Sequence, residues 1–328
     1  CISGSIVVPN FGAGPANTEF DVIAGMQTNL ISDTSNSALR TFHGNIPTIA
    51  SVLSSQGYDP FSFHQGQSWF YNRNSALSFM GMESLRFDNG ETWSDEDFLS
   101  ELVEELEART ADGEKLLTYA TTIQNHQAYN YAKYGSELPQ VQTAMSLSPE
   151  TEECLSVYAY GLKCSSEMLL ELTEYLNAQS EPYILVFFGD HMPNLGAGYQ
   201  GYGELGLSLG ATDTPEQVLD IYTAPFIIWA NDAYLQGRSM EEATKSLELP
   251  ADGRVSACFL GELALELADA AGLDPYFSYL GELRRVCPVI KTGIVGRADG
   301  SLTESPTEQE LELIRKMHCW QYFRMTTH

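Results

Sequence analysis

The sequence predicts an α/β fold with a mainly parallel β-sheet. Strand-like apolar runs alternate with amphipathic helical patterns along most of the chain, which is typical of this class. The run over residues 183–188 (YILVFF) is apolar throughout, as in strands that helices cover on both faces. Several runs end in Gly, Asp, Asn or His, and in such folds the sites form at the carboxyl ends of strands.

The first third of the chain predicts a strand, a sharp turn and a helix. An apolar run over residues 6–9 leads into a turn rich in Gly and Pro, and apolar residues at helical spacing follow from Phe20 to Met26. Ser94 is a favourable N-cap, with Asp97 three residues later. The elements expected next are a helix over 46–56 stopped by Gly57, a strand over 58–64, a helix over 95–108 and a strand over 115–124.

The remainder continues this alternation and then changes character. The elements expected there are a helix over 152–177, strands over 183–188 and 226–229, and a helix over 255–271. From Val289 onward we expect a short strand, a turn near Gly300 and a charged helix from Thr307. The prediction is a main domain over residues 1–288 and a small α+β subdomain over residues 289–328.

Composition limits the classes of partner. The chain has 328 residues and a formal net charge of −27, which argues against nucleic acid because phosphate backbones need basic surfaces. A phosphate substrate stays possible, since a metal and a few cations can reverse the charge within a pocket. The six cysteines form no CxxC pair, so we expect buried thiols and no zinc knuckle.

No apolar run of 18 residues occurs, so the sequence predicts no membrane span. The chain starts at Cys1 within a strand-like segment. We therefore expect residues upstream of it, which would carry any membrane anchor or export signal.

Asp190 and His191 follow the apolar run over residues 183–188 directly after Gly189. A carboxylate and an imidazole are good ligands for Zn, Mn or Mg-like ions. Gly189 allows the backbone to turn so that both side chains converge. The alternative is an Asp that caps a helix beside a surface His.

His64, His126 and Arg73 are the next candidates. The histidines end two predicted strands, and Arg73 lies nine residues after His64. Imidazole binds phosphate oxygens or transfers protons, and guanidinium contacts phosphate through two hydrogen bonds. A lone His is more often structural. Tyr71 is positioned to contact an apolar part of a substrate, whereas for Trp69 we expect core packing.

Several segments resemble one family, the lipoteichoic acid synthase-like proteins. The segment 187–193 (FFGDHMP) resembles their metal-binding motif, 122–126 (TIQNH) their TMQNH, and 16–20 (ANTEF) their TANTEFE. His64 followed by the segment 71–73 (YNR) resembles their His…Trp-Asn-Arg, with Tyr71 in place of Trp. Shorter matches at 94–96 (SDE), 224–226 (APF) and 320–322 (WQY) follow in the same order.

This resemblance implies a sulfatase or alkaline-phosphatase-like three-layer sandwich at the extracellular face of the cell membrane, anchored by upstream helices. It implies transfer of glycerol phosphate from phosphatidylglycerol, a glycerophospholipid, to a glycerol-phosphate polymer similar to lipoteichoic acid. One divalent metal is implied, Mn first, with Mg or Zn as alternatives. The residues implied are Asp190 and His191 for the metal, and His64, Tyr71, Arg73 and His126 for the substrate.

Two departures from the family pattern bear on catalysis. The family's nucleophilic Thr, which also binds the metal, corresponds here to Pro15, and proline has no hydroxyl. The ligand Glu of the family lies in a strand upstream of Cys1, so the main domain is expected to be truncated at its N-terminus. Thr18 is a substitute candidate one helical turn further on.

Three functions therefore remain open at this point. The chain is part of a phosphoglycerol transferase, or a degenerate member that binds glycerol-phosphate polymers or a partner protein without turnover. The third possibility is a phosphatase or sulfatase on the same fold, because a fold does not fix the substrate.

Overall fold

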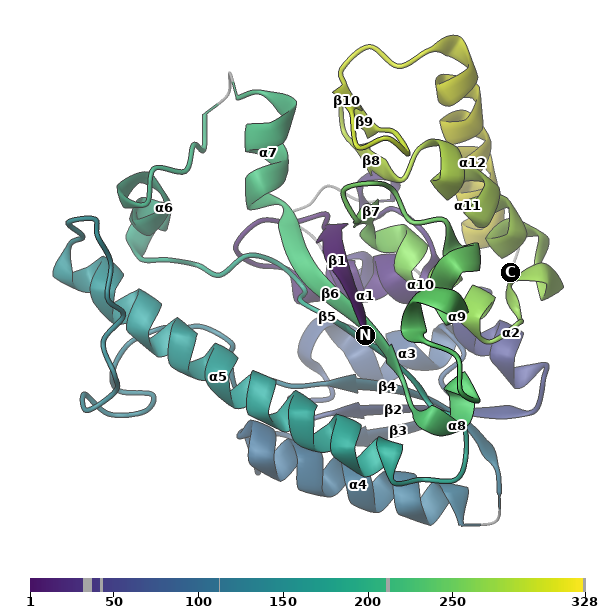
Figure 1. Ribbon diagram of the computed structural model, residues 1–328, viewed down its shortest axis with the longest axis horizontal. Coiled ribbons are helices and arrows are strands. Elements are labelled where there is room, and N and C mark those ends of the chain that lie inside the picture. Colours follow the sequence, from purple (N-terminus) through teal and green to yellow (C-terminus); the bar gives the residue numbers. More distant parts are fainter. Residues whose placement is uncertain (32–36, 42–43, 112, 211–212, 327–328) are drawn as a thin grey trace.

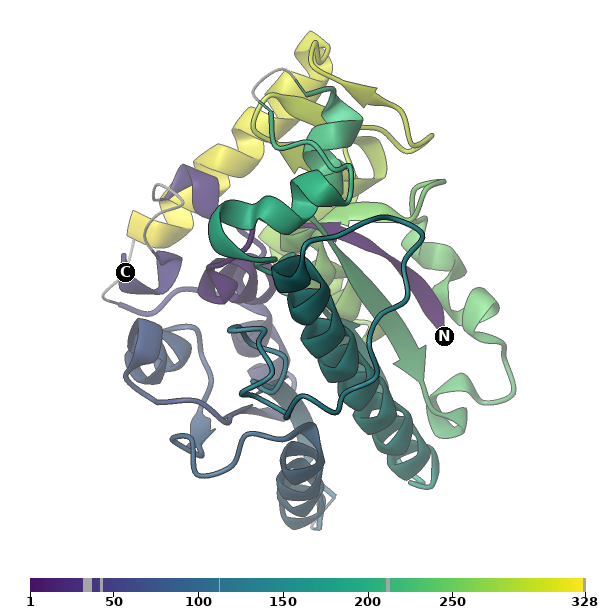
Figure 2. The same ribbon diagram turned by 90° about the vertical axis from the view of Figure 1, so that its left-hand side faces the viewer.

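The structure, a computed structural model, describes residues 1–31, 37–41, 44–111, 113–210 and 213–326. Figures 1 and 2 show its arrangement in two views. The strands are β1 (Ile2–Val7), β2 (Tyr58–His64), β3 (Ser84–Phe87), β4 (Lys115–Thr121), β5 (Ile184–Phe188), β6 (Thr223–Ala230), β7 (Arg254–Ser256), β8 (Val289–Lys291), β9 (Ile294–Gly296) and β10 (Leu302–Thr303). The α-helices are α1 (Pro15–Ala24), α2 (Ile49–Ser54), α3 (Arg73–Phe79), α4 (Asp95–Thr110), α5 (Pro149–Asn177), α6 (Gln200–Glu204), α7 (Pro215–Ile221), α8 (Asp232–Leu235), α9 (Met240–Thr244), α10 (Leu260–Leu267), α11 (Pro275–Val286) and α12 (Glu308–Thr326).

Two groups of strands form the middle of the molecule. One sheet has the order β3-β2-β4 and is entirely parallel. The other has the order β5-β6-β1-β7, in which β1 and β7 are parallel while β6 runs antiparallel to both β5 and β1. The parallel prediction is therefore correct for β2, β3, β4 and the β1–β7 pair, and β6 makes the second sheet mixed.

Helices cover both faces of these strands, as the α/β prediction requires. On one face, α4 and α5 lie along the strands (Figure 1). They pack on Phe61 and Phe63 of β2 and on side chains of β4, β5 and β6. On the other face, α1, α2, α10 and α11 bury a larger core that contains Phe20, Phe259 and Phe277. Since α5 contacts both groups of strands, they lie in one layer between two helical layers.

Two apolar strands, β4 and β5, lie at sheet edges and are incompletely buried. β4 and β5 are both edge strands, and their apolar side chains are only half-buried along nearly their whole length. Leu116 and Ala120 of β4 and Leu185 of β5 pack on the same α4–α5 cluster. An edge strand presents unpaired backbone donors and acceptors, so this part of the layer has room for further pairing.

Local signals placed most elements correctly. β2 has the predicted bounds, and Ser94 accepts a hydrogen bond from the backbone N–H of Asp97 at the start of α4. The helix predicted over 46–56 begins only at Ile49, because Pro47 precedes Thr48 and Thr48 forms a capping box.

The helix predicted over 255–271 is wrong in its first part. Val255 lies in β7, fully buried, and pairs in parallel with Ile6 of β1. The helical segment is shorter, from Leu260 to Leu267 in α10. Sheet pairing with a distant strand overrides the local helical spacing here.

The C-terminal elements follow the predicted order of strand, turn and helix. β8, β9 and β10 form an antiparallel sheet, and α12 closes the chain. Ile290, Ile314 and Met317 are buried in the same core as α1 and α11. The boundary between residues 288 and 289 stays a prediction.

Among the described residues, no helix is both long and apolar enough to cross a membrane. All six cysteines are free, and Cys154, Cys258 and Cys287 are buried, as expected, while Cys1 and Cys319 are exposed.

The close contact between α1 and α10 generates a stability prediction. A Cβ added at Gly261 would lie 2.2 Å from the carbonyl oxygen of Val22, so Gly261→Ala must push the two helices apart. We expect the free energy of unfolding, measured with denaturant, to fall by about 1–3 kcal/mol. Gly203→Ala in α6 is the control, because nothing lies within 4 Å of the added carbon. Equal effects of the two substitutions would contradict the close packing.

Candidate functional site

The N-terminal half of α1 forms the base of the site. β1 ends at Val7, Gly14 adopts a left-handed conformation (φ 87°), and Pro15 occupies the first turn of α1, where its missing N–H costs nothing. Thr18 and Glu19 follow within the helix and are buried. The fold therefore accepts a residue without a hydroxyl where the family resemblance places the nucleophile.

Glu19 forms a buried ion pair with Arg73, the first residue of α3. The Nε and Nη2 atoms of Arg73 donate to the two carboxylate oxygens at 3.1 and 2.5 Å, and both side chains are 3% exposed. The ring of Tyr71 lies 5.1 Å from the Arg73 guanidinium carbon. Tyr71 and Asn72 both have positive φ, which turns the chain sharply before α3.

Burial and charge act in opposite directions on this pair. Burial alone would raise the pKa of Glu19, yet the Arg73 guanidinium holds it below its usual value. Burial would likewise lower the pKa of Arg73, and the Glu19 carboxylate raises it instead. Both groups are therefore charged, and together they are neutral.

His64, at the end of β2, is an uncharged neighbour of this pair. Burial and the Arg73 charge lower its pKa to about 4, against a smaller opposing effect of Glu19. Its Nδ1 accepts a hydrogen bond from the backbone N–H of Gly66 at 2.7 Å. The proton of the neutral ring therefore lies on Nε2, which is a hydrogen-bond donor.

Asp190 and His191 follow β5 and connect to α1. The hydroxyl of Thr18 donates to the backbone carbonyl of Asp190 at 2.6 Å. His191 is largely buried, the Asp190 carboxylate is 45% exposed, and Nε2 of His191 lies 3.4 Å from Oδ2 of Asp190. The negative charge of Asp190 also contributes to raising the pKa of Tyr119 on β4, after burial and the charge of Glu19.

The Asp190–His191 pair fits a cation. Nδ1 of His191 lies 2.8 Å from the carbonyl oxygen of Met192, an acceptor only, so this nitrogen carries the proton and Nε2 has a lone pair. That lone pair and the Asp190 carboxylate are both electron donors, and a metal ion would satisfy both. Within the described ranges, no group of three or more His, Cys, Asp or Glu side chains converges on a metal position, so the chain offers two ligands.

Two other residues singled out from the sequence, His126 and Trp69, lie at the surface. His126 is exposed and its Nδ1 lies 2.7 Å from the Gln127 carbonyl oxygen. In the part of the chain that the structure describes, no hydrogen bond or ion pair joins His126 to Arg73 or Asp190. The prediction that Trp69 packs in the core is wrong: Trp69 is 67% exposed, because the turn before α3 directs it outward.

Two residues of the cluster escaped the sequence prediction. Glu19 appeared only as part of a motif, and Tyr119 not at all, yet both lie within electrostatic reach of Arg73. A Glu on the buried face of an apolar helix is a signal that a partner exists. No local pattern could identify Arg73, 54 residues away, as that partner.

The family model described as Sulfatase matches residues 4–267. The chain belongs to the sulfatase family. A curated relative, the putative cyclic beta-1,2-glucan modification protein of Rhizobium meliloti (strain 1021), is 26% identical over 240 residues, or 70% of this chain. The chain spans 36% of that relative's length.

Solved structures of sulfatase-fold proteins confirm the predicted fold. The phosphoglycerol transferase GacH of Streptococcus pyogenes, in complex with sn-glycerol-1-phosphate, superposes with a TM-score of 0.65 at 15% identity, over 98% of this chain and 75% of that one. The lipoteichoic acid synthase LtaP of Listeria monocytogenes gives 0.65 at 14%, over 99% and 84%. The C-terminal periplasmic domain of EcEptC from Escherichia coli, in complex with Zn, gives 0.52 at 16%, over 83% and 74%.

The lowered pKa of His64 generates a pH prediction. Between pH 6.5 and 4 the unfolded chain binds a proton at this residue and the folded chain does not, so stability rises with pH in this window. The contribution amounts to about 3 kcal/mol at about 1.4 kcal/mol per pKa unit. The His64→Gln protein should lack this rise in the free energy of unfolding when denaturant unfolding is measured at a series of pH values. Above pH 7.5, the difference between the two proteins should be constant; a constant difference down to pH 4 would contradict a neutral buried His64.

Proposed function

We propose that the chain is the glycerol-phosphate-binding region of an extracellular, metal-dependent phosphoglycerol transferase. The observation that carries this is the cluster of Glu19, Arg73, His64 and Asp190 at one end of the strands. The likeness to GacH and LtaP, a transferase that binds sn-glycerol-1-phosphate and a lipoteichoic acid synthase, supports this class of substrate. A membrane-bound glycerophospholipid is the proposed donor.

The chain's own residues would receive the phosphate. Glu19 occupies Nε and Nη2 of Arg73, so Nη1, with a single long contact of 3.5 Å to the Phe70 carbonyl, remains for a phosphate oxygen. His64 Nε2–H would donate to a second oxygen. Thr18 holds the Asp190 backbone, and Tyr71 supports the Arg73 guanidinium.

The charges of the cluster explain why a metal is needed. Glu19 and Arg73 cancel, His64 is neutral, and the Asp190 carboxylate adds a negative charge that would repel phosphate. Asp190 and His191 would hold a divalent ion, Mn by the family resemblance or Mg or Zn instead. When bound, such an ion offsets phosphate charge and favours a deprotonated hydroxyl nucleophile.

The half-buried edges of β4 and β5 are compatible with the upstream strand that the resemblance implies. An added strand there would pair with unpaired backbone on both sides and cover apolar side chains of both edges. Its carboxyl end would reach the region of Asp190 and supply the Glu that this chain lacks.

Pro15 favours a second candidate function, binding without turnover. Transfer breaks the phosphorus–oxygen bond to diacylglycerol and forms one to an acceptor hydroxyl, whose proton ends on the diacylglycerol oxygen. A covalent intermediate at position 15 is impossible, because proline carries no nucleophilic atom. Thr18 is fully buried and its hydroxyl donates a hydrogen bond to the backbone carbonyl oxygen of Asp190, which supports a positioning role for it.

The acceptor also has two candidates. The family resemblance implies a glycerol-phosphate polymer, whereas the name of the Rhizobium relative concerns a cyclic glucan. The first acceptor is a polyanion, whereas the second is neutral before modification. The charge of the surface around the site therefore indicates which of the two is bound more favourably.

Binding of sn-glycerol-1-phosphate in the presence of Mn²⁺, measured by calorimetry, tests the proposed site. We expect Glu19→Gln combined with Arg73→Gln, which removes both buried charges together, to weaken binding at least tenfold, or about 1.4 kcal/mol. Arg86→Gln, on the outer strand β3, is the control. Asp190→Asn should abolish the effect of Mn²⁺. Unchanged binding in the double variant would overturn the site.

Catalysis needs a separate test. We expect no release of diacylglycerol from phosphatidylglycerol by this chain with Mn²⁺, because Pro15 has no hydroxyl. A longer protein that includes residues upstream of Cys1 and carries Pro15→Thr should gain turnover. Turnover in the unmodified chain that disappears in Thr18→Ala would show instead that Thr18 is the nucleophile.

A further inference from the structure

A strip of aromatic rings is formed by the loop before α4, the segment after β4 and helix α5. We call it the aromatic strip and define it as Trp93, Tyr134 and Tyr160. The ring centroids of Trp93 and Tyr134 are 5.6 Å apart with a 33° tilt, and those of Tyr134 and Tyr160 are 4.9 Å apart at 62°. Trp93 is 45% exposed, and the two tyrosines are half-buried. The rings therefore present contiguous aromatic surface to solvent.

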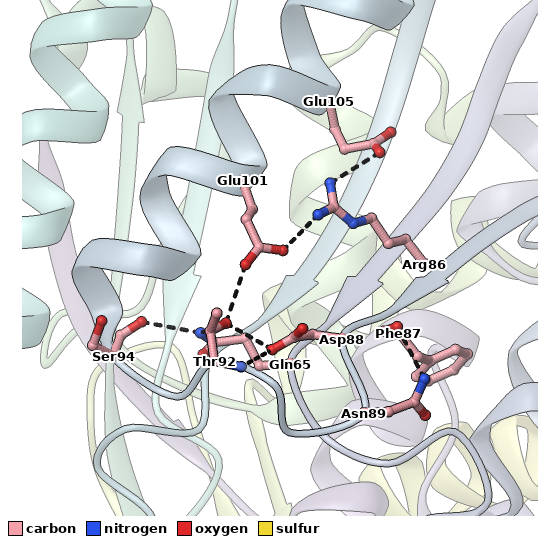
Figure 3. Close-up of polar contacts among 9 residues, drawn as sticks. All are labelled: Gln65, Arg86, Phe87, Asp88, Asn89, Thr92, Ser94, Glu101 and Glu105. Atoms are coloured by element: carbon pink, nitrogen blue, oxygen red, sulfur yellow. Dashed lines mark hydrogen bonds and ion pairs between the residues drawn. The ribbon is translucent and has the colours of Figure 1, made fainter.

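The loop that carries Trp93 is fixed before any ligand arrives. Figure 3 shows Thr92 within hydrogen-bond distance of the carboxylates of Asp88 and Glu101, at 2.6 and 3.1 Å. Gln65 donates to the backbone carbonyl of Ser94 at 3.0 Å on the other side of Trp93. Holding the residues on both sides of an exposed Trp reduces the entropy lost when it binds a ligand.

The strip is joined to the candidate site through the segment after β4. The Tyr134 hydroxyl lies 3.2 Å from the Gln124 carbonyl oxygen. The Lys133 ammonium lies 5.6 Å from the Tyr134 ring centroid and donates to the backbone carbonyl of His126. Tyr129, in the same segment, is close enough to Asp190 for that carboxylate to contribute to its raised pKa, after burial and Tyr158.

The polar groups along the strip favour a sugar over an acyl chain. Tyrosine combines a flat apolar face with a hydroxyl, and a pyranose has the complementary form, an apolar C–H face bordered by hydroxyls. Lys133 and Lys163 lie beside the rings of Tyr134 and Tyr160. An acyl chain would cover these polar groups and displace water from them without offering a hydrogen bond in return, which costs free energy.

The charges along the strip disfavour a polyanion. Lys163 is paired with Glu167 at 2.6 Å, and Asp95 lies within electrostatic reach of Lys133. No net positive charge results from these pairs, and the chain as a whole carries −27. A glycerol-phosphate polymer would be repelled at long range, while a neutral glycan is indifferent to this field.

We infer that the aromatic strip is the acceptor subsite of the phosphoglycerol transfer proposed above, and that it binds a neutral glucan by stacking of pyranose rings. The role of the glucan as acceptor rests on that proposed function, but binding of glucan to the strip is measurable without turnover. Of the two candidate acceptors, the proposed one is therefore the neutral glucan and not the polyanionic glycerol-phosphate polymer.

The experiment titrates the chain with unmodified cyclic β-1,2-glucan, using Trp fluorescence and calorimetry, with Mn²⁺ and sn-glycerol-1-phosphate present. We expect Trp93→Ala and Tyr160→Ala each to weaken glucan binding at least tenfold. Tyr322→Ala, which removes an aromatic side chain 74% exposed on α12, is the matched control and should bind normally. Thermal unfolding of each variant shows that the fold is intact.

Two further probes distinguish the alternatives. A poly(glycerol phosphate) oligomer that binds as tightly as the glucan and loses affinity in Trp93→Ala would overturn the choice of a neutral acceptor. Vesicles of phosphatidylglycerol that bind through Trp93 in preference to glucan would show a lipid contact instead. Absence of glucan binding, or binding that Trp93→Ala and Tyr160→Ala leave unchanged, would also overturn the subsite. Failure of the proposed function appears separately, as sn-glycerol-1-phosphate binding that does not depend on Arg73.

Discussion

The buried ion pair between Glu19 and Arg73 holds the site together. It joins α1, which follows the turn after β1, to α3, which follows the parallel β2 strand. Loss of one partner would leave an uncompensated charge in a dry environment, which costs on the order of 3–5 kcal/mol. The pair thereby fixes the orientation of the guanidinium, while burial, together with the Arg73 charge, keeps the adjacent His64 neutral.

This neutrality determines what the site can bind. A buried pair of opposite charges attracts no anion from a distance, so under the proposed function a phosphate would need Nη1 of Arg73 and an additional cation. The Thr18 hydroxyl and the Met192 carbonyl hold Asp190 and His191, which we propose as ligands of that cation. On this proposal, binding of metal and binding of phosphate would be coupled through charge. The acidic surface beyond the site then favours a neutral second substrate over another polyanion.

A residue without a hydroxyl at position 15 is compatible with this arrangement. Pro15 occupies a helix position that needs no N–H donor, and Thr18 and Glu19 form their contacts further along α1. If position 15 is that of the family's nucleophile, as the resemblance implies, the chain keeps the cluster without a nucleophile there. The presence of the geometry is evidence for binding, and catalysis requires its own evidence.

The sequence by itself determined the α/β class, the bounds of β2, the N-cap of α4, and the placement of Asp190 and His191 after an apolar strand, although the expected cover on both faces of that strand is wrong because β5 is a half-buried edge strand. These features depend on local periodicity and on residues a few positions apart. Only the tertiary structure decided the partner of Glu19, the antiparallel course of β6, the strand conformation of Val255 and the exposure of Trp69. The first three depend on contacts between segments distant in the chain, where burial of charge or pairing of backbone outweighs local preference. The exposure of Trp69 follows from the turn at Tyr71 and Asn72 before α3.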